Sequence, residues 1–263
     1  MKSDKASRGS LMGEGVAEPL VLAGRPPTVL AFHGLTGTPQ EVALVVEAAA
    51  ELGLAAEAPL LPGHGKRVLD LAPTRFSDWL AAAEQDYARV AQRGPVIVAG
   101  LSMGALLALH LAKNHRENVV GVIALANAMW LHRPWPTLPL KLLDRLGAPD
   151  FWMPKAGADL GDREQRAIHL TYNAQPVHAA ISLLRAGEAL SNELHRVIAP
   201  ALLLHGALDA VTPVDNAWRV AVRLGSLQKR TVILPRSRHI LTRDVERDTV
   251  KRELTAFLTP LAG

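Results

Sequence analysis

Short apolar runs alternate with longer amphipathic stretches along most of this chain. The apolar runs have the length of strands and cover residues 28–32, 54–59, 95–99, 119–125, 201–204 and 231–234, with a shorter edge strand at 19–23. The stretches between them favour helices over about 39–52, 78–93, 105–112, 213–224 and 243–258. Near-continuous apolar strands that alternate with helices are typical of a parallel sheet covered by helices on both faces. The predicted fold class is therefore α/β, with a mostly parallel central sheet.

Polar residues just before three of these helices predict where the helices begin. Thr38 precedes Pro39, and Glu41 follows Thr38 after three residues, which is the pattern of a capping box. Ser77 is the expected N-cap of the next helix, and Thr212 is the expected N-cap of a later one. We therefore expect each of these hydroxyl oxygens to accept a hydrogen bond from a helix N–H.

The alternation stops after residue 126 and resumes at residue 200, and no segment between them predicts a strand. Helical pieces joined by proline-rich turns are expected there instead, near 138–146, 162–170 and 177–194. Ligands of such sheets bind beyond the carboxyl ends of the strands. We therefore expect the irregular stretch to cover that edge of the sheet as a cap.

This pattern divides the chain into three parts. The core is expected to comprise residues 19–126 and 200–263, and the helical cap insert residues 127–199. Residues 1–18 form a polar N-terminal arm that can be disordered. One large domain with an insertion agrees with a length of 263 residues, of which 49% are hydrophobic.

Charge and cysteine content exclude several classes of function. The formal net charge is +4, and no basic run stands out, so nucleic-acid binding is not indicated. The chain has no cysteine, which excludes disulfides, thiolate chemistry and cysteine-ligated metals. Residues 1–15 lack the apolar core of a signal peptide, and no run approaches the roughly 20 apolar residues of a membrane span. We expect a cytoplasmic protein without a transmembrane segment; the oligomeric state is left open.

A serine between two glycines carries the first sign of chemistry. Gly100, Ser102 and Gly104 form a Gly-x-Ser-x-Gly pattern between the strand at 95–99 and the helix at 105–112. Strand, tight turn and helix are the arrangement of a nucleophile elbow, in which the serine hydroxyl stands clear of the sheet. The pattern arises by chance in roughly one chain in ten of this length, so its partners decide the interpretation.

A serine hydroxyl needs a base to take its proton and a group to orient that base. Asp209 lies in the loop just after the strand at 201–204, and His239 in the loop after the strand at 231–234. Alone, each is more often a turn or surface residue. Together with Ser102 they follow the order Ser…Asp…His on one edge of the sheet. We therefore predict a catalytic triad.

The tetrahedral intermediate also needs backbone N–H donors for its oxyanion. One is expected from Met103, directly after the serine, and the other from Leu35 in the glycine-rich loop at 33–37. His33 in that loop is interpreted as a packing and hydrogen-bonding residue. His64, in a glycine-bracketed loop at the same edge, is more often structural than catalytic.

These residues together resemble the α/β-hydrolase superfamily, and within it the bacterial carboxylesterases and monoacylglycerol lipases. The resemblance covers residues 28–258 and rests on His33-Gly34-Leu35-Thr36-Gly37, Pro62-Gly63-His64-Gly65, Gly100-Leu101-Ser102-Met103-Gly104, His205-Gly206 with Asp209, and Ser237-x-His239. One departure is Arg238, where these enzymes often carry glycine. This arginine either crowds the leaving-group side of the site or faces solvent.

The resemblance implies an α/β-hydrolase fold and a role for each site residue. Ser102 would be the nucleophile, His239 the general base and then acid, and Asp209 the group that orients the imidazole. The N–H groups of Leu35 and Met103 would form the oxyanion hole. The resemblance implies no cofactor.

The insert is rich in large apolar residues. Three tryptophans, Trp130, Trp135 and Trp152, lie in it and either form a wall for an acyl chain or pack the cap on the sheet. Trp130 and Trp152 are the candidate substrate-binding residues. The acidic and histidine residues of the insert do not have metal-ligand spacing, so we expect no metal there; they include Asp159, Asp162 and His169.

The predicted function is hydrolysis of carboxylic esters through an acyl-enzyme. The expected substrate is a small molecule, either an uncharged ester with a short or medium acyl chain or a monoacylglycerol. An amidase, a thioesterase or a C–C hydrolase would use the same triad, and a non-catalytic ligand receptor could share the fold. Epoxide and haloalkane hydrolases need a carboxylate at the tip of the elbow, where this chain has Ser102.

Overall fold

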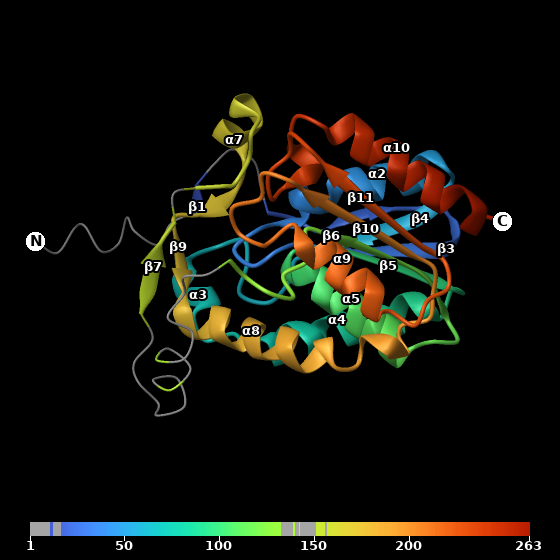
Figure 1. The fold of residues 1–263 in the computed structure, drawn as a ribbon, viewed down its shortest axis with the longest axis horizontal. Helices are drawn as coiled ribbons and strands as arrows, with labels where there is room; N and C mark the ends of the chain where they lie inside the picture. The colour runs from blue at the N-terminus through green and yellow to red at the C-terminus, as the bar shows by residue number, and fades with distance from the viewer. Residues whose placement is uncertain (1–10, 13–16, 133–138, 140–141, 143–150, 156) are drawn as a thin grey trace, which may run out of the picture.

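The computed structural model describes residues 11–12, 17–132, 139, 142, 151–155 and 157–263. Its centre is a seven-stranded sheet with the strand order β11-β10-β6-β5-β3-β4-β2 (Figure 1). Neighbouring strands pair in parallel, except that β2 pairs antiparallel with β4. The strands are β2 Leu20–Leu22, β3 Arg25–Phe32, β4 Leu54–Ala58, β5 Val96–Leu101, β6 Val119–Leu125, β10 Ala201–Gly206 and β11 Lys229–Leu234.

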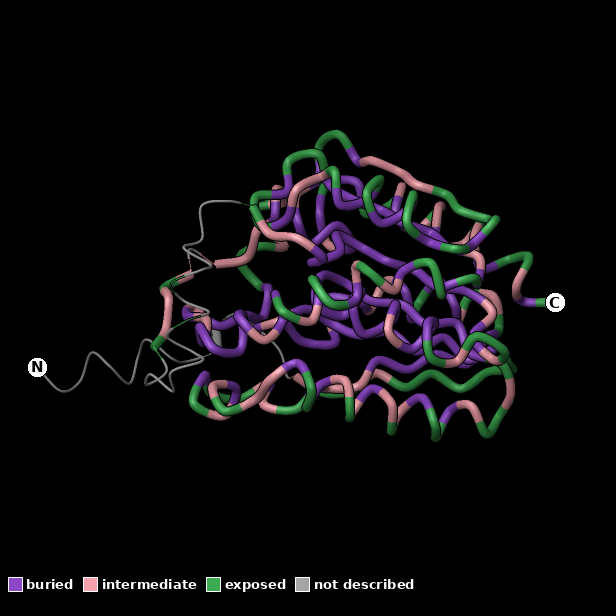
Figure 2. Tube along the Cα trace, turned by 60° about the horizontal axis from the view of Figure 1, so that its bottom comes forward, coloured by how far each residue is buried: buried purple, intermediate pink, exposed green. Residues whose placement is uncertain are grey.

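Helices cover both faces of this sheet, as the alternating pattern predicts. Helices α2 (Ala43–Glu51) and α10 (Arg247–Leu258) lie on one face. The other face carries α4 (Phe76–Ala91), α5 (Met103–Asn114), α8 (Val177–Ser191) and α9 (Asp215–Arg223). Figure 2 shows the buried strands at the centre, with the exposed residues on the outer sides of the helices. The predicted α/β-hydrolase architecture of the core is confirmed.

Alternate residues of the strands enter two separate apolar cores, because successive side chains of a strand point to opposite faces. Leu30 and Phe32 of β3 pack with α4 and α5, whereas Val29 and Ala31 pack with α2 and α10. All four side chains are fully buried. The edge of the sheet that carries the functional loops is therefore supported from both sides.

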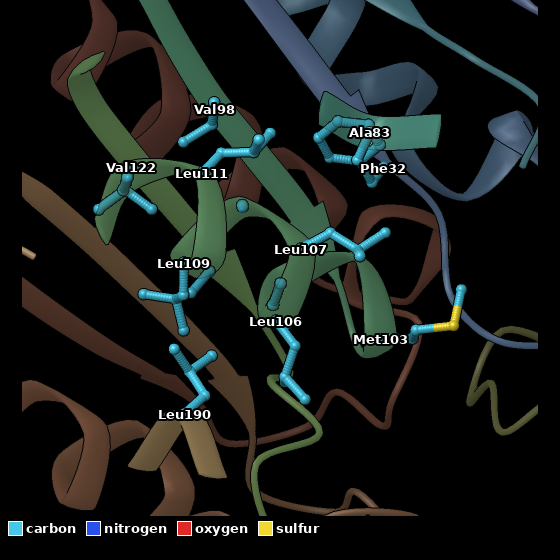
Figure 3. Packing of buried hydrophobic residues seen from close by; sticks show 14 of the residues in the cluster. Phe32, Ala83, Val98, Met103, Leu106, Leu107, Leu109, Leu111, Val122 and Leu190 are labelled. Atoms are coloured by element: carbon cyan, nitrogen blue, oxygen red, sulfur yellow. The ribbon is translucent and has the colours of Figure 1, made fainter. Parts of the chain in front are cut away.

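Helix α5 is apolar on nearly every side, which is typical of a helix enclosed by other elements. Figure 3 shows its leucines among side chains of β3, α4, β5, β6 and α8; these neighbours are Phe32, Ala83, Val98, Val122 and Leu190. Leu106, Leu107, Leu109 and Leu111 are all inaccessible to solvent. The N-terminus of this helix is thus held rigidly at the sheet edge.

Thr38 occupies the predicted N-cap position, with Pro39 in the first turn, but none of the three predicted hydroxyl caps forms its hydrogen bond. Thr38 makes no capping hydrogen bond, and a 3-10 helix (Pro39–Val42) precedes α2. Helix α4 begins at Phe76, and its first turn is closed by Asp78, whose carboxylate accepts a hydrogen bond from the Arg75 N–H, 2.8 Å away. Ser77 therefore lies inside the helix.

The last two helices also begin later than predicted. Helix α9 starts at Asp215 and has no side-chain cap, because the Thr212 hydroxyl donates to Asp209 instead. Helix α10 starts at Arg247, after a 3-10 helix at Leu241–Arg243. Polar side chains that could cap a helix are used elsewhere in the fold, which local spacing does not reveal.

The prediction that the insert has no strands is also wrong. Strand β7 (Trp152–Pro154) pairs antiparallel with β9 (Ala174–Pro176), and β8 (Thr171–Tyr172) pairs antiparallel with β1 (Leu11–Met12) of the N-terminal arm. These strands have two or three residues, too few to show an alternating pattern. Most of the arm, and all but residues 139 and 142 of the helix expected near 138–146, lie outside the described residues.

The remaining helices are short. Helix α7 (Arg163–Ile168) is capped by Asp162, whose Oδ1 accepts from two helix N–H groups. The others are α3 Val68–Leu71 and the 3-10 helices Leu194–Arg196 and Thr259–Leu261. Among the described residues, no helix combines the length and the apolar character that a membrane span requires.

Candidate active site

Ser102 occupies a strained turn between β5 and α5. Its backbone angles are φ 58° and ψ −114°, a conformation that non-glycine residues rarely adopt. A Cβ at Gly100 would lie 2.1 Å from Gly104, and a Cβ at Gly104 would lie 2.0 Å from the carbonyl oxygen of Phe32. Both glycines are therefore required, the first by helix α5 and the second by the neighbouring strand β3.

Asp209 and His239 lie together on the loops that follow β10 and β11. Nδ1 of His239 is 2.7 Å from Oδ2 of Asp209. The other carboxylate oxygen accepts the backbone N–H groups of Val211 and Thr212, each at 2.8 Å. The Thr212 hydroxyl donates to Oδ2, also at 2.8 Å. These contacts fix the orientation of the carboxylate, so that Oδ2 faces His239.

The charges of this pair reinforce each other. Burial alone would raise the pKa of Asp209, but the charges and hydrogen bonds of His239 and His205 hold it well below its ordinary value. Burial opposes protonation of His239, yet the adjacent Asp209 raises the pKa of His239 above its ordinary 6.5. Because an ionised carboxylate only accepts, Nδ1 of His239 carries the proton and Nε2 is left free to act as a base.

A second histidine contacts Asp209. Nε2 of His205, near the end of β10, lies 3.1 Å from Oδ2 of Asp209 and 3.1 Å from the Thr212 hydroxyl. Both His205 and Thr212 are fully buried. The sequence predicts neither role: it predicts Thr212 as a helix cap and includes His205 only as part of a motif. The spacing of His205, four residues before Asp209 at a strand end, is the signal that could have indicated it.

The loop at residues 33–37 passes beside the elbow. A Cβ at Gly34 would lie 3.3 Å from the Cβ of Ser102. Leu35 lines the same cavity as Ser102, and Met103 is the first residue of α5, where N–H groups have no intrahelical acceptor. Between described residues, no backbone hydrogen bond uses the N–H of either residue. Both donors are free for a ligand oxygen.

His33 and His64 brace this loop from behind. Nε2 of His33 accepts from the N–H of Leu61 at 3.1 Å, and Nε2 of His64 accepts from the N–H of Thr36 at 3.2 Å. Burial lowers the pKa of both imidazoles, that of His64 to about 3. Both histidines are neutral and accept hydrogen bonds from backbone N–H groups. This agrees with the prediction from sequence that His33 and His64 are structural rather than catalytic.

Glu41 is a buried carboxylate directly behind the loop, and sequence reasoning assigned it to a helix cap. Its Oε2 accepts from the N–H of Gly34 at 2.8 Å, and its Oε1 lies 3.3 Å from Nε2 of His169. Arg243 in turn donates to Nδ1 of His169. Burial would raise the pKa of Glu41, but the contact with His169 and the hydrogen bond from the Gly34 N–H bring it down to about 2. The oxyanion loop therefore rests on a permanently charged group.

Replacing Glu41 with alanine is expected to lower kcat by on the order of a hundredfold, close to the cost of losing one oxyanion-hole donor. The reason is that the unpaired Gly34 N–H would let Leu35 shift, while KM changes little. Steady-state kinetics with p-nitrophenyl butanoate measure both constants. Glu41→Gln keeps an acceptor oxygen for Gly34 and should recover part of the loss.

Glu57 offers the matched control for this prediction. It is also a buried carboxylate in ion pairs, with Arg89 and Arg93, but it lies on β4 away from the elbow. Glu57→Ala should destabilise the fold without a selective loss of kcat. An unchanged kcat in folded Glu41→Ala protein would contradict the positioning role of Glu41.

Asp159 of the insert forms hydrogen bonds to both loops that carry Asp209 and His239. Its Oδ2 accepts from the N–H of Ala210 at 2.8 Å and from the N–H of His239 at 3.3 Å. Its Oδ1 lies 3.1 Å from the guanidinium of Arg238, whose side chain is 39% exposed. Arg238 thus combines an ion pair with partial exposure to solvent. No local pattern in the sequence indicated this role for Asp159.

A cavity of about 420 Å³ opens onto Ser102 and His239. Part of its wall is apolar and includes Leu101, Ala128, Leu131, Ala180, Leu183 and Ile240. Trp130 and Trp152 are not among its lining residues; both pack against the core on the α5 side. The Trp130 ring lies 3.7 Å from the guanidinium carbon of Arg219. Trp135 lies outside the described residues.

The described part of the chain contains no cluster of three or more histidine, aspartate or glutamate side chains arranged to hold a metal ion. The acidic and histidine residues of the insert contact protein groups instead. Asp162 caps α7, Asp159 binds the Arg238 loop, and His169 lies between Glu41 and Arg243.

A serine raised on a strand-to-helix turn of a mostly parallel sheet is typical of the α/β hydrolases, and the chain is an enzyme of that class. A sequence model of the family described as "Serine aminopeptidase, S33" matches residues 25–246, and the chain belongs to this family.

Relatives of known name are similar over nearly the whole chain. The thermostable monoacylglycerol lipase of Bacillus sp. (strain H-257) is 30% identical over 250 residues, which cover 94% of this chain and 96% of that protein. The carboxylesterase of Bacillus subtilis (strain 168) is 21% identical over 93% of this chain and 97% of that protein.

Solved structures show the same fold. A structure reported for the metagenome-derived lipolytic enzymes LipS and LipT has a TM-score of 0.84 and 29% identity, covering 93% of this chain and 98% of that chain. The monoacylglycerol lipase of Paleococcus ferrophilus has a TM-score of 0.76 at 21% identity, covering 91% of this chain and 98% of that chain. At 21% identity, the similarity to the Paleococcus ferrophilus structure shows a shared fold only.

Proposed function

We propose that this protein is a serine-dependent carboxylic ester hydrolase for short- to medium-chain esters or monoacylglycerols. The observation that carries the proposal is the Asp209–His239 pair, joined at 2.7 Å, whose histidine lines the same cavity as Ser102 on its strained turn. The similarity to a monoacylglycerol lipase and a carboxylesterase supports an ester as substrate.

In the proposed mechanism, Nε2 of His239 takes the proton of Ser102 as its oxygen attacks the ester carbonyl. The N–H groups of Leu35 and Met103 hold the oxyanion, and Asp209 stabilises the imidazolium. His239 then gives its proton to the departing alcohol, which leaves an acyl-enzyme on Ser102. A water molecule, activated by the same histidine, repeats the attack and releases the acid. The free Nε2 and the two free backbone donors support this sequence of steps.

Residues 127–199 are proposed to form a cap over this site, with residues 19–126 and 200–263 as the core. Residues of this segment line the cavity beside Ser102 and His239, which supports the proposal; they include Leu131, Lys155, Ala180 and Leu183. Asp159 and His169 also contact core residues beside the site. The cap would therefore shape the pocket for the acyl and alcohol parts of the substrate.

A panel of substrates with different leaving groups tests the proposed function. The purified protein should hydrolyse p-nitrophenyl butanoate, p-nitrophenyl octanoate and monolauroylglycerol, and should hydrolyse the matching p-nitroanilide much more slowly. A thioester and a vinylogous diketone complete the panel. Faster turnover of the amide, the thioester or the diketone would support the corresponding alternative hydrolase. Binding without turnover of any compound would support a receptor and contradict the proposal.

A further inference from the structure

A lysine lies in the wall of the substrate cavity. Lys155 directly follows β7, and its backbone N–H donates to Asn173 at 2.9 Å, which extends the pairing of β7 with β9. Its side chain lines the same cavity as Ser102 and His239. Nζ donates to the hydroxyl of Thr36 and, at 3.3 Å, to the hydroxyl of Thr171. The ammonium group therefore reaches the loop that carries Leu35.

The charge of this ammonium group has no direct counter-ion within the described residues. No carboxylate there forms an ion pair with Nζ, and its acceptors are two neutral hydroxyls. Burial lowers the pKa of Lys155 to about 8, and the charge of Glu41 opposes this shift from a distance. Lys155 is thus still mostly protonated near neutral pH.

The two carboxylates in the cavity wall are already engaged with other groups. Glu41 accepts from Gly34 and faces His169, while Asp159 pairs with Arg238. An ammonium group has three N–H donors, and the described residues supply acceptors for two of them. Lys155 is half-buried, and a partly desolvated charge without a direct partner is costly, so a ligand anion would offset part of that cost.

We propose that Lys155 binds a carboxylate carried by the substrate, so that the natural substrate is an ester with an anionic group a few bonds from the scissile carbonyl. This inference rests on the proposed ester hydrolysis at Ser102 and revises the uncharged ester that the sequence predicts. Thr36, which Lys155 contacts, is the residue after Leu35, so the ammonium lies close to the oxyanion loop. The apolar wall of Leu101, Leu131 and Leu183 would hold the rest of the ester.

The carboxylate could belong to the acyl part or to the alcohol part of the ester, and two pairs of substrates distinguish these sources. Monomethyl adipate is compared with methyl hexanoate, and the butanoate ester of glycolate is compared with propyl butanoate. Hydrolysis is followed by titration of the released acid near neutral pH, where Lys155 is charged. The parent protein, Lys155→Met and Lys155→Arg are measured for each ester.

In one of the two pairs, Lys155→Met should lower kcat/KM for the anionic ester by about tenfold or more, the effect of one charge-assisted hydrogen bond. The neutral ester of that pair should change by less than about twofold, since it makes no such contact. Lys155→Arg keeps the charge, so it should retain most of the kcat/KM of the parent protein for the anionic ester. Lys229→Met, an exposed lysine at the start of β11, is the matched control and should leave every ester unaffected.

Two results would overturn the inference while leaving the proposed function intact. One is an equal loss for neutral and anionic esters in Lys155→Met, which would mean that Lys155 only ties β7 to the oxyanion loop. The other is efficient hydrolysis of the neutral esters by the parent protein with no activity on either anionic ester. Failure of the parent protein to hydrolyse any of the four esters would instead contradict the proposed function.

Discussion

Replacing Ser102 with alanine is expected to lower kcat for p-nitrophenyl butanoate by on the order of a millionfold, as for the removal of a serine nucleophile in other hydrolases. Alanine retains the Cβ and so keeps the strained turn at φ 58° without the hydroxyl that attacks the ester. The loss should therefore appear in kcat, because no acyl-enzyme can form. Steady-state kinetics on protein with an unchanged melting temperature measures it.

Ser226 provides the control for this substitution. It is also buried, and its hydroxyl donates to Gln228 just before β11, at the opposite edge of the sheet. Ser226→Ala should keep the activity of the parent protein. Activity of Ser102→Ala within a factor of about ten of the parent would mean that the hydroxyl does not carry the reaction.

Replacing Asp209 with asparagine is expected to lower kcat by roughly ten-thousandfold. The neutral amide no longer stabilises the imidazolium, and it can hold His239 in the wrong tautomer. The pH profile should change as well. Asp209 raises the pKa of His239, and the base acts only when neutral, so activity is lost as the pH falls through that raised pKa. Without the negative charge, this acidic limb of kcat/KM should move to lower pH.

Asp86→Asn is the matched control, because Asp86 forms an ion pair with Arg89 on the surface of α4, remote from the site. It should change neither kcat nor the position of the acidic limb. An Asp209→Asn protein with the parent pH profile would show that Asp209 does not set the protonation of His239.

The sheet and the elbow could be predicted because their signals are local. An apolar run of four to seven residues predicts a buried strand. Close contact with α5 and β3 requires glycine at Gly100 and Gly104. The loops after β10 and β11 follow from strand order alone, since parallel strands bring their carboxyl ends to one edge. The sequence therefore predicts that Asp209 and His239 lie near one another.

Other features could not be predicted because their partners are distant in sequence. Glu41 was expected to cap its own helix, yet its carboxylate binds Gly34 and faces His169. Thr212 was expected to cap α9, yet its hydroxyl donates to Asp209. The capping pattern specifies which residue types are suitable, but not which of several available donors they bind in the folded protein.

The insert contributes to the site in a way that its tryptophans did not indicate. Asp159 contacts the loops of Asp209 and His239, His169 faces the carboxylate behind the oxyanion loop, and Lys155 contacts that loop directly. These polar contacts connect the segment that would select the substrate with the groups that would perform the chemistry. Substitutions in the insert are therefore expected to affect turnover as well as specificity.

Covalent labelling of Ser102 tests the central claim most directly. A fluorophosphonate forms a stable bond only with an activated serine, and peptide mass analysis after digestion locates it. The parent protein should gain one phosphonyl group on Ser102, Ser102→Ala should gain none, and Asp209→Asn should react far more slowly. Intact parent protein that stays unlabelled, or a label on another serine with Ser102 unmodified, would contradict the assignment of Ser102 as the nucleophile.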